Sequence, residues 1–324
     1  MKIAHWTIGN GSGMYRVAES ICEAEKQIGC DSVLINLDKP ETFSEADDAD
    51  IHVAHTHLSA KALHDKKSKI VWVGHGTPEV NFHGAYEAGI GDRYGHGDGW
   101  MLAQFWLQNA DAIVTFWPRH QKIWKSLCDK RTEVNLVPMG VDKTFWSPQT
   151  SNGKFVGEPS VLTAENSYEI KWPLDLFIAW PWVTEDDALH EARLHAIYLP
   201  RDQHRWWFPL VNRNGCSFRS YISPIAFDHN SLRNAFCSTD FYLGLVRYGD
   251  FNRICLEAKA TGAKVISYRG NPYADFWITE GDQRIIAEEL TKILRGEVEP
   301  RDTKPVDNIA DTAKAMKEIY EKIS

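Results

Sequence analysis

Short apolar runs alternate with helical patterns along the first half of the chain. Residues 2–8 predict a strand. After a glycine-rich segment, apolar residues recur at spacings of four, three and four, on one face of a predicted helix: Val17, Ile21, Ala24 and Ile28. Further strands are predicted at 32–37, 51–55, 70–73 and 113–116. This alternation favours a doubly wound α/β domain with a mostly parallel sheet.

The second half repeats the same alternation. Strands are predicted at 160–164, 194–199, 241–246 and 264–268, and a helix over 251–261 ends at Gly262. Turn-forming residues gather between Pro148 and Pro159, which makes this stretch the expected linker. The sequence therefore predicts two Rossmann-like α/β domains.

Composition narrows the function classes. The 324 residues are 43% hydrophobic and carry a net charge of −8, with no basic half that would suit nucleic acid. No apolar run is long enough to span a membrane, so any membrane contact is expected to be peripheral. The six cysteines form no C-x-x-C pair, and the N-terminus lacks a leader pattern. We expect a cytoplasmic protein.

Candidate chemistry lies where predicted strands end. In a doubly wound sheet these loops share one rim, so we expect Gly9–Gly13, His55–His57 and His75–Pro78 to converge there. The amides of Gly11, Ser12 and Gly13 suit an anion, and the alternative is a tight turn without a ligand. A dinucleotide fingerprint would need glycine at Met14.

Seven of the eight histidines in the first hundred residues, those from His52 to His96, invite a metal hypothesis. No H-E-x-x-H pattern or suitably spaced acid accompanies them, which favours ordinary polar roles and a metal-independent protein. His75 differs from the others because the turn at Gly-Thr-Pro places it at a strand's carboxyl end. A basic amphipathic helix over 119–131 has two interpretations, a solvated helix face or a membrane-surface contact.

Two acids flank the start of the predicted helix at 251–261. Asp250 stands at the N-cap position, and Glu257, seven residues later, lies on nearly the same face. Together they could hold sugar or ribose hydroxyls by charge-assisted hydrogen bonds. The alternative is that Asp250 only caps the helix and Glu257 only makes a surface ion pair.

A resemblance now adds to these patterns. The stretch LVRYGDFNRICLEAKATGAKV at 245–265 resembles the donor-site signature of the family four retaining glycosyltransferases. Other landmarks follow in the family's order: GSGMYRVAESI, IHVAHTH, VWVGHG, ADAIVTF and VPMGVDKTFWSP. The resemblance covers almost the whole chain.

The resemblance implies a GT-B fold, two Rossmann-like doubly wound domains facing across a cleft. Domain one would span 1–148 together with a C-terminal helix at about 307–324, and domain two 149–306. It implies a metal-independent hexosyl- or pentosyltransferase that uses a nucleoside diphosphate sugar as donor and no other cofactor. The expected acceptor is a saccharide or cell-envelope glycan, with a glycolipid second; nucleic acid is disfavoured but not excluded by the acidic balance.

Site roles carry over by position. Glu257 matches the ribose ligand, Lys171 the diphosphate-gripping lysine, Gly11, Ser12 and Gly13 the phosphate loop, and His75 the histidine beside sugar and acceptor. Amides near Asn252 and Arg253 would stabilise the leaving diphosphate.

Two departures from the pattern keep alternatives open. The family's first glutamate falls on Gly249, with Asp250 beside it, and its arginine falls on Glu165 or Asn166. Asp250 is the candidate substitute for the glutamate, and Arg247, Arg253 or Arg201 for the arginine. A sugar-nucleotide epimerase and a binding protein without turnover therefore remain as alternatives.

Overall fold

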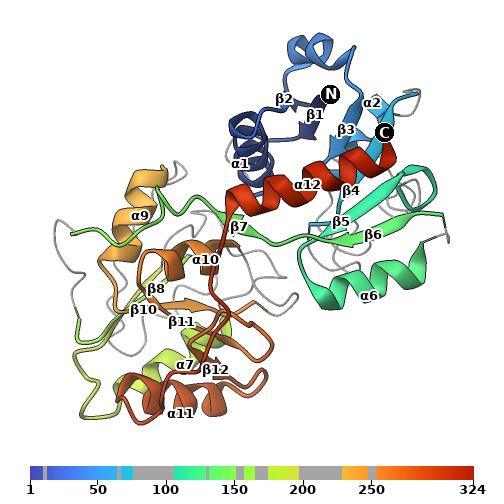
Figure 1. Cartoon of the computed structure of the whole chain (residues 1–324). Coiled ribbons are helices and arrows are strands. Elements are labelled where there is room, and N and C mark those ends of the chain that lie inside the picture. Colours follow the sequence, from blue (N-terminus) through green and yellow to red (C-terminus); the bar gives the residue numbers. More distant parts are fainter. Residues whose placement is uncertain are drawn as a thin grey trace. The chain divides into compact units, whose positions relative to one another are not determined.

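The described structure forms two compact units. A computed structural model describes residues 1–9, 13–63, 67–75, 106–128, 131–150, 157–164, 174–196, 228–246 and 253–324. One unit comprises Met1–Asp142 with Asp307–Ser324, and the other Lys143–Val306 (Figure 1). Both units are mixed α/β with parallel sheets, which confirms the predicted fold class.

The first unit is built on a parallel sheet of six strands in the order β2-β1-β3-β4-β5-β6. The first strand, β1, lies inside the sheet. The next strand, β2, is added on one side of β1, and β3 to β6 follow on its other side. The strands are β1 (Lys2–Thr7), β2 (Asp31–Asn36), β3 (Ile51–Ala54), β4 (Lys69–Val73), β5 (Ala112–Thr115) and β6 (Glu133–Leu136).

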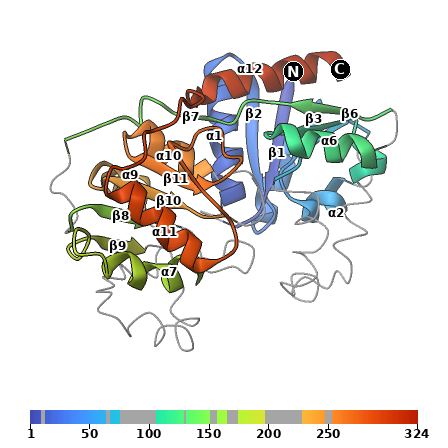
Figure 2. The ribbon, with the colours of Figure 1, turned by 90° about the horizontal axis from the view of Figure 1, so that it is seen from below.

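Helices connect and cover these strands, as Figure 2 shows from a second direction. Helix α1 turns its apolar stripe inward, so that Val17, Ile21 and Ala24 are buried as the spacing predicts. Pro118 opens α6, and Trp124 anchors it in the core. The helical elements are α1 (Gly13–Gln27), η1 (Pro40–Ala46), η2 (His57–Ser59), α2 (Ala60–Leu63), α6 (Pro118–Leu127) and α12 (Ile309–Ile323).

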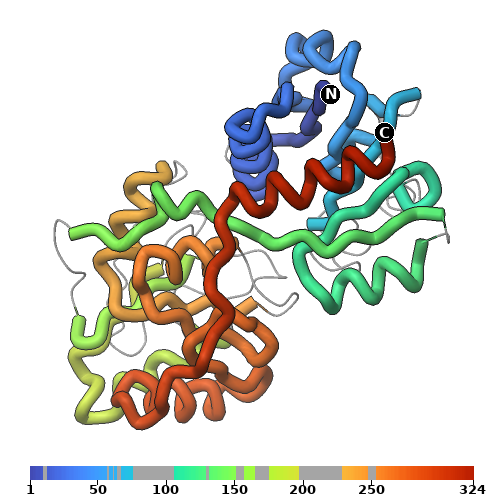
Figure 3. The backbone as a smooth tube through the Cα atoms, viewed as in Figure 1, coloured from blue at the N-terminus to red at the C-terminus, as the bar shows by residue number. Residues whose placement is uncertain are grey.

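The last helix, α12, belongs to the first unit. It packs against α1, and a capping box between Asn308 and Asp311 fixes its start. The Ser324 hydroxyl lies 3.7 Å from the Met1 sulfur, so the two ends of the chain meet (Figure 3). The amphipathic helix α12 therefore belongs to the same unit as β1, although the second unit separates them along the chain.

A two-stranded parallel pair brings the chain back to this unit. Strand β7 (Gly140–Val141) pairs with β13 (Asp307–Asn308), just before α12 begins. A Cβ added to Gly140 would lie 2.2 Å from the backbone oxygen of Asn308. Only glycine lets the two backbones approach this closely.

The second unit holds a parallel sheet in the order β12-β11-β10-β8-β9. Its core joins apolar residues of this sheet to the helices α7 and α11. The elements are β8 (Ser160–Thr163), α7 (Leu174–Thr184), β9 (Arg193–Ala196), α9 (His229–Cys237), β10 (Phe241–Gly244), α10 (Arg253–Ala260), β11 (Lys264–Tyr268), β12 (Phe276–Ile278) and α11 (Gln283–Leu294).

Substituting Gly140→Ala is expected to destabilise the protein by at least about 2 kcal/mol, because backbone must shift to admit the methyl group. Urea unfolding of both proteins would measure the difference. Gly13→Ala is the matched control, since an added Cβ there meets no atom within 4 Å. Equal stability of Gly140→Ala and wild type would contradict the close approach.

Candidate functional site

The strand order of the first unit defines a switch point between β1 and β3. These neighbours lead in opposite directions across the sheet, and such points are where doubly wound folds bind ligands. The segments after β1, β3 and β4 include the predicted Gly13, His55 and His75. The described part of this edge therefore carries the residues that the sequence places there.

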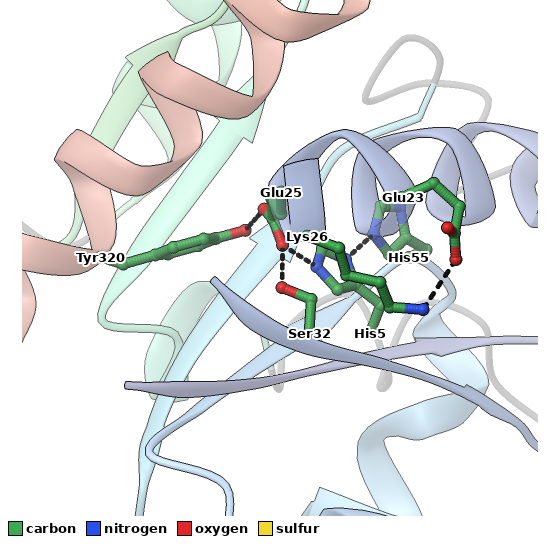
Figure 4. A network of polar contacts seen from close by, with 7 residues as sticks. All are labelled: His5, Glu23, Glu25, Lys26, Ser32, His55 and Tyr320. Carbon is green, nitrogen blue, oxygen red and sulfur yellow. Dashed lines mark hydrogen bonds and ion pairs between the residues drawn. The ribbon is translucent and has the colours of Figure 1, made fainter. Parts of the chain in front are cut away.

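Three histidines, one in β1 and two just after β3 and β4, form a hydrogen-bonded chain at this edge. His75 Nε2 lies 3.0 Å from His55 Nδ1, and His55 Nε2 lies 3.0 Å from His5 Nδ1. His5 Nε2 then reaches the Glu25 carboxylate at 2.7 Å (Figure 4). His75 is the partly exposed end of this chain, whereas His5 and Glu25 are fully buried.

Glu25 is held by three donors. Besides His5, the Ser32 hydroxyl donates to its Oε2 at 2.7 Å, and the Tyr320 hydroxyl donates to its Oε1 at 2.9 Å (Figure 4). The three groups come from β1, β2 and α12. A buried carboxylate requires such compensation, because an unpaired charge there would cost several kcal/mol.

Burial sets the protonation of two members of the network. Burial, followed by the charge of Glu25, raises the pKa of the Tyr320 hydroxyl well above its ordinary value. Burial, with His75 and His5 on either side, lowers the pKa of His55 well below its ordinary value. Tyr320 therefore remains a donor, and His55 remains neutral, with one protonated and one unprotonated ring nitrogen.

The glycine loop is described only at its two ends. Gly9 adopts a positive φ of 71°, and its amide donates to the Asp38 carboxylate at 2.9 Å. Gly13 is exposed and begins α1. Asp38 thus anchors the loop, while the amide end of a fifteen-residue helix follows it. Gly11 and Ser12 lie outside the described residues.

The second unit has its own switch point, between β8 and β10. Helix α10 follows β10 and carries Arg253 as its first residue. One turn later, Glu257 forms an ion pair with Arg253, with Nε and Oε1 3.2 Å apart. Both side chains are nearly buried, at 12% and 11% exposed. Glu257 therefore does make an ion pair, but not at the surface.

The remaining predicted site residues lie outside the described residues: Lys171, Arg247, Asp250 and Asn252. Lys171 belongs to the segment that follows β8, and the other three belong to the segment that follows β10. Their positions along the chain thus relate them to the two strands of the second switch point. Their roles remain predictions.

The sequence reasoning missed Glu25, His5 and Tyr320 as members of the site. One signal was available for Glu25, because it follows Ile21 by four residues and so falls on the apolar face of its helix. A charged residue on a buried face needs a partner. The partnership with Tyr320, 295 residues away, has no signal in the sequence pattern.

The sequence also raised a basic helix at 119–131 and a metal site among the histidines. Arg119, Lys122 and Lys125 of α6 are exposed while Trp124 is buried, the arrangement of a solvated helix face. Among the described helices, none is long and apolar enough to cross a bilayer. Across the same residues, no three His, Cys, Asp or Glu side chains form a metal-binding group.

A pocket of about 780 Å³ opens at the opposite edge of the first sheet. Its lining includes Asp50 and Lys69, where β3 and β4 begin, and Lys317 and Glu321 from α12. None of the predicted site residues lines it. It lies at the strand starts, so it is separate from the switch-point edge described above.

Comparison with known proteins defines the fold as GT-B, the fold of glycosyltransferases built from two Rossmann-like domains. No protein-family model and no curated protein sequence matches the chain.

The chain is similar in fold to several solved structures. A sucrose-phosphate synthase from Thermosynechococcus elongatus is 14% identical with a TM-score of 0.70, over 100% of this chain and 96% of that one. HepE from Anabaena, in complex with UDP-glucose, is 13% identical with a TM-score of 0.66, over 100% and 98%. A glycosyltransferase from Rickettsia africae is 13% identical with a TM-score of 0.60, over 99% and 98%. At this identity the likeness shows the fold.

Substituting Tyr320→Phe is expected to cost roughly 1–3 kcal/mol at neutral pH, since Glu25 loses a buried donor. The folded state holds the Tyr320 proton more tightly than the unfolded chain. That contribution is fully present below the ordinary tyrosine pKa of about 10 and is lost as pH rises further, by up to about 1.4 kcal/mol per pH unit. Urea unfolding should therefore show the stability gap between wild type and variant narrowing at alkaline pH. A constant gap would contradict this assignment.

Proposed function

We propose that this protein is a metal-independent retaining glycosyltransferase. It moves a hexosyl or pentosyl group from a nucleoside diphosphate sugar to a hydroxyl of a saccharide or cell-envelope glycan. The carrying observation is the full-length likeness to GT-B structures, one of them bound to UDP-glucose, combined with predicted site residues at both switch points. Motifs in the family's order support the same proposal.

The donor side of the proposal rests on α10. Glu257 is a nearly buried carboxylate one turn inside a helix, where ribose hydroxyls can donate to it. Its ion pair with Arg253 fixes the carboxylate before a ligand arrives, which limits the ordering cost of binding. The amides of Arg253 and Asn252 at the helix start suit the diphosphate.

The leaving diphosphate needs positive charge at the second unit and at the glycine loop. Lys171 supplies a mobile point charge, and the amides of Gly11, Ser12 and Gly13 approach the same phosphates. Arg247 replaces the family's missing arginine, and Asp250 replaces its first glutamate by binding a sugar hydroxyl. With no metal required, no other cofactor enters the proposal.

The chemistry proposed is front-face attack. The acceptor oxygen forms a bond to the anomeric carbon while the bond to the phosphate oxygen breaks on the same face. The departing phosphate takes the acceptor's proton, so charge is conserved without a two-carboxylate glycosidase pair. His75, at the edge of the first unit, contacts the transferred sugar and the acceptor.

The proposed setting is the cytoplasm, with at most peripheral membrane contact.

The aromatic side chains of the second unit give little information about the identity of the acceptor. Trp180 is buried in the second core, and Trp182 stacks under the Arg284 guanidinium at 4.9 Å. These two tryptophans serve packing, which leaves the acceptor to be identified by assay.

Product analysis tests the proposed function against its two alternatives. Purified protein is incubated with UDP-, GDP- and ADP-sugars, alone and with candidate acceptors, and products are separated by mass and anomeric configuration. A transferase yields a retained glycoside and slow nucleotide release, an epimerase a new sugar-nucleotide, and a binding protein neither. An inverted glycoside would overturn the retaining mechanism alone.

Substituting Glu257→Gln is expected to weaken binding of the nucleoside diphosphate about tenfold or more, because hydrogen bonds to a charged group contribute roughly 1.5–3 kcal/mol. Calorimetric titration measures this. Glu288→Gln, an exposed change on α11 of the same unit, is the control and should bind as wild type does. Equal binding by Glu257→Gln would remove Glu257 from the donor site.

Substituting Lys171→Ala is expected to lower the rate of sugar transfer by at least about a hundredfold, since the leaving diphosphate loses a charge partner. Initial rates under donor saturation measure the effect, and circular dichroism confirms that the fold is kept. A rate near that of wild type would exclude Lys171 from the mechanism.

A further inference from the structure

Helix α6 carries a row of positive charges that the proposed transfer reaction does not use. Arg119, Lys122 and Lys125 recur at every third residue, and all three are exposed; we call them the cationic stripe. We infer that the cationic stripe, together with the exposed Leu127, docks the protein on a membrane that contains anionic phospholipids. The contact is peripheral, and the inference does not depend on the proposed function.

Packing fixes which side of α6 meets the solvent. The helix packs against β5 and β6 (Figure 1). Trp124 is fully buried, and its ring contacts that of Trp72 in β4 edge to face, with the centroids 4.8 Å apart. Gln121 Nε2 donates to the Val134 carbonyl of β6 at 3.0 Å. Residues three apart are neighbours on a helix surface, so the packing that buries Trp124 holds the whole cationic stripe outward.

The charges of the cationic stripe are not balanced by the fold. Among the described residues none of its three side chains forms an ion pair, and α6 itself contains no Asp or Glu. Like charges at this spacing on a helix repel one another. The stripe stands out in a chain that has 44 acidic residues and a net charge of −8. An anionic partner would supply the compensation that the fold does not.

The charge on the other long helices is mixed. On α12 the exposed Lys314 and Lys322 each lie four residues from the exposed Glu318, and on α11 the exposed Lys292 lies four residues from the exposed Glu288. Such acids repel an anionic surface while the lysines attract it. The attraction is therefore concentrated at α6, and the acidic remainder of the protein favours an orientation that turns α6 toward the surface.

Apolar side chains beside the cationic stripe distinguish a membrane from other anionic partners. Leu127 is 44% exposed, and Ile123, one turn earlier, is half-buried. A helix that lies in a membrane interface places its cations among the headgroups and its apolar side chains at the start of the acyl layer. A soluble polyanion or a nucleic acid backbone offers the charge without that layer. The combination of residues thus favours phospholipid.

Vesicle sedimentation tests the docking surface. Wild-type protein should bind vesicles made of equal parts phosphatidylcholine and phosphatidylglycerol, and not vesicles of phosphatidylcholine alone. Arg119→Gln, Lys122→Gln and Lys125→Gln combined should lower the partition coefficient roughly a hundredfold, because each cation near an anionic surface contributes a factor of about five. Raising the salt from about 0.1 M to about 1 M should release the wild type, since the screening length falls from roughly 10 Å to 3 Å.

Matched controls separate position from total charge. The combined variant Lys292→Gln, Lys314→Gln and Lys322→Gln removes as much charge from α11 and α12 and should bind as wild type does. Leu127→Gln should weaken binding severalfold, whereas Ile285→Gln, at an α11 residue that is also 44% exposed, should not. Circular dichroism checks that each variant keeps its fold. Equal loss in the two triple variants, or no loss in Leu127→Gln, would overturn the inference.

A footprint on the wild-type protein tests the same surface without any variant. Acetylation of lysines, read by mass spectrometry, should slow at Lys122 and Lys125 when anionic vesicles are added, and remain unchanged at Lys292 and Lys314. Binding to duplex DNA or heparin in the absence of vesicle binding would overturn the membrane as partner. Because no sugar donor is present, a protein that transfers no sugar could still dock, and a transferase that ignores vesicles would refute this inference alone.

Discussion

The structure of the first unit depends on how one buried charge is compensated. Glu25 has no exposed surface, and three donors from three parts of the fold surround its carboxylate. These contacts tie α1 to the sheet and to α12. Without them the helix would bury an uncompensated charge, which costs far more than any single apolar contact gains. The same contacts lead through two histidines to the switch-point edge, so packing and site share one network.

The side chains near the two switch points are held in place in different ways. In the first, histidines of neighbouring strands connect the edge to the core. In the second, the ion pair between Arg253 and Glu257 lies within a single helix, α10. The described contacts of the first switch point thus join residues that are far apart in the chain, up to 295 positions for Glu25 and Tyr320.

Much of this architecture follows from the sequence because strand and helix periods are local properties. The strand predicted at 264–268 has the observed bounds, and the stripe beginning at Val17 faces the core of the first unit. Glu25 sits on that stripe and was not predicted as part of the site, because a pattern reports burial but not partners. Gly140 was read as part of a motif; its contact with Asn308 depends on a pairing between distant segments. The predicted ligand roles stay predictions.

The position of Tyr320 carries a consequence for synthesis on the ribosome. The strands of the first sheet and α1 are complete before half of the chain has been made, yet Glu25 receives its Tyr320 hydrogen bond from a residue 295 positions later. Until then, the nascent domain holds a carboxylate that lacks one donor and a helix surface that lacks its cover. Of these two units, the one that is begun first is accordingly finished after the other has been made.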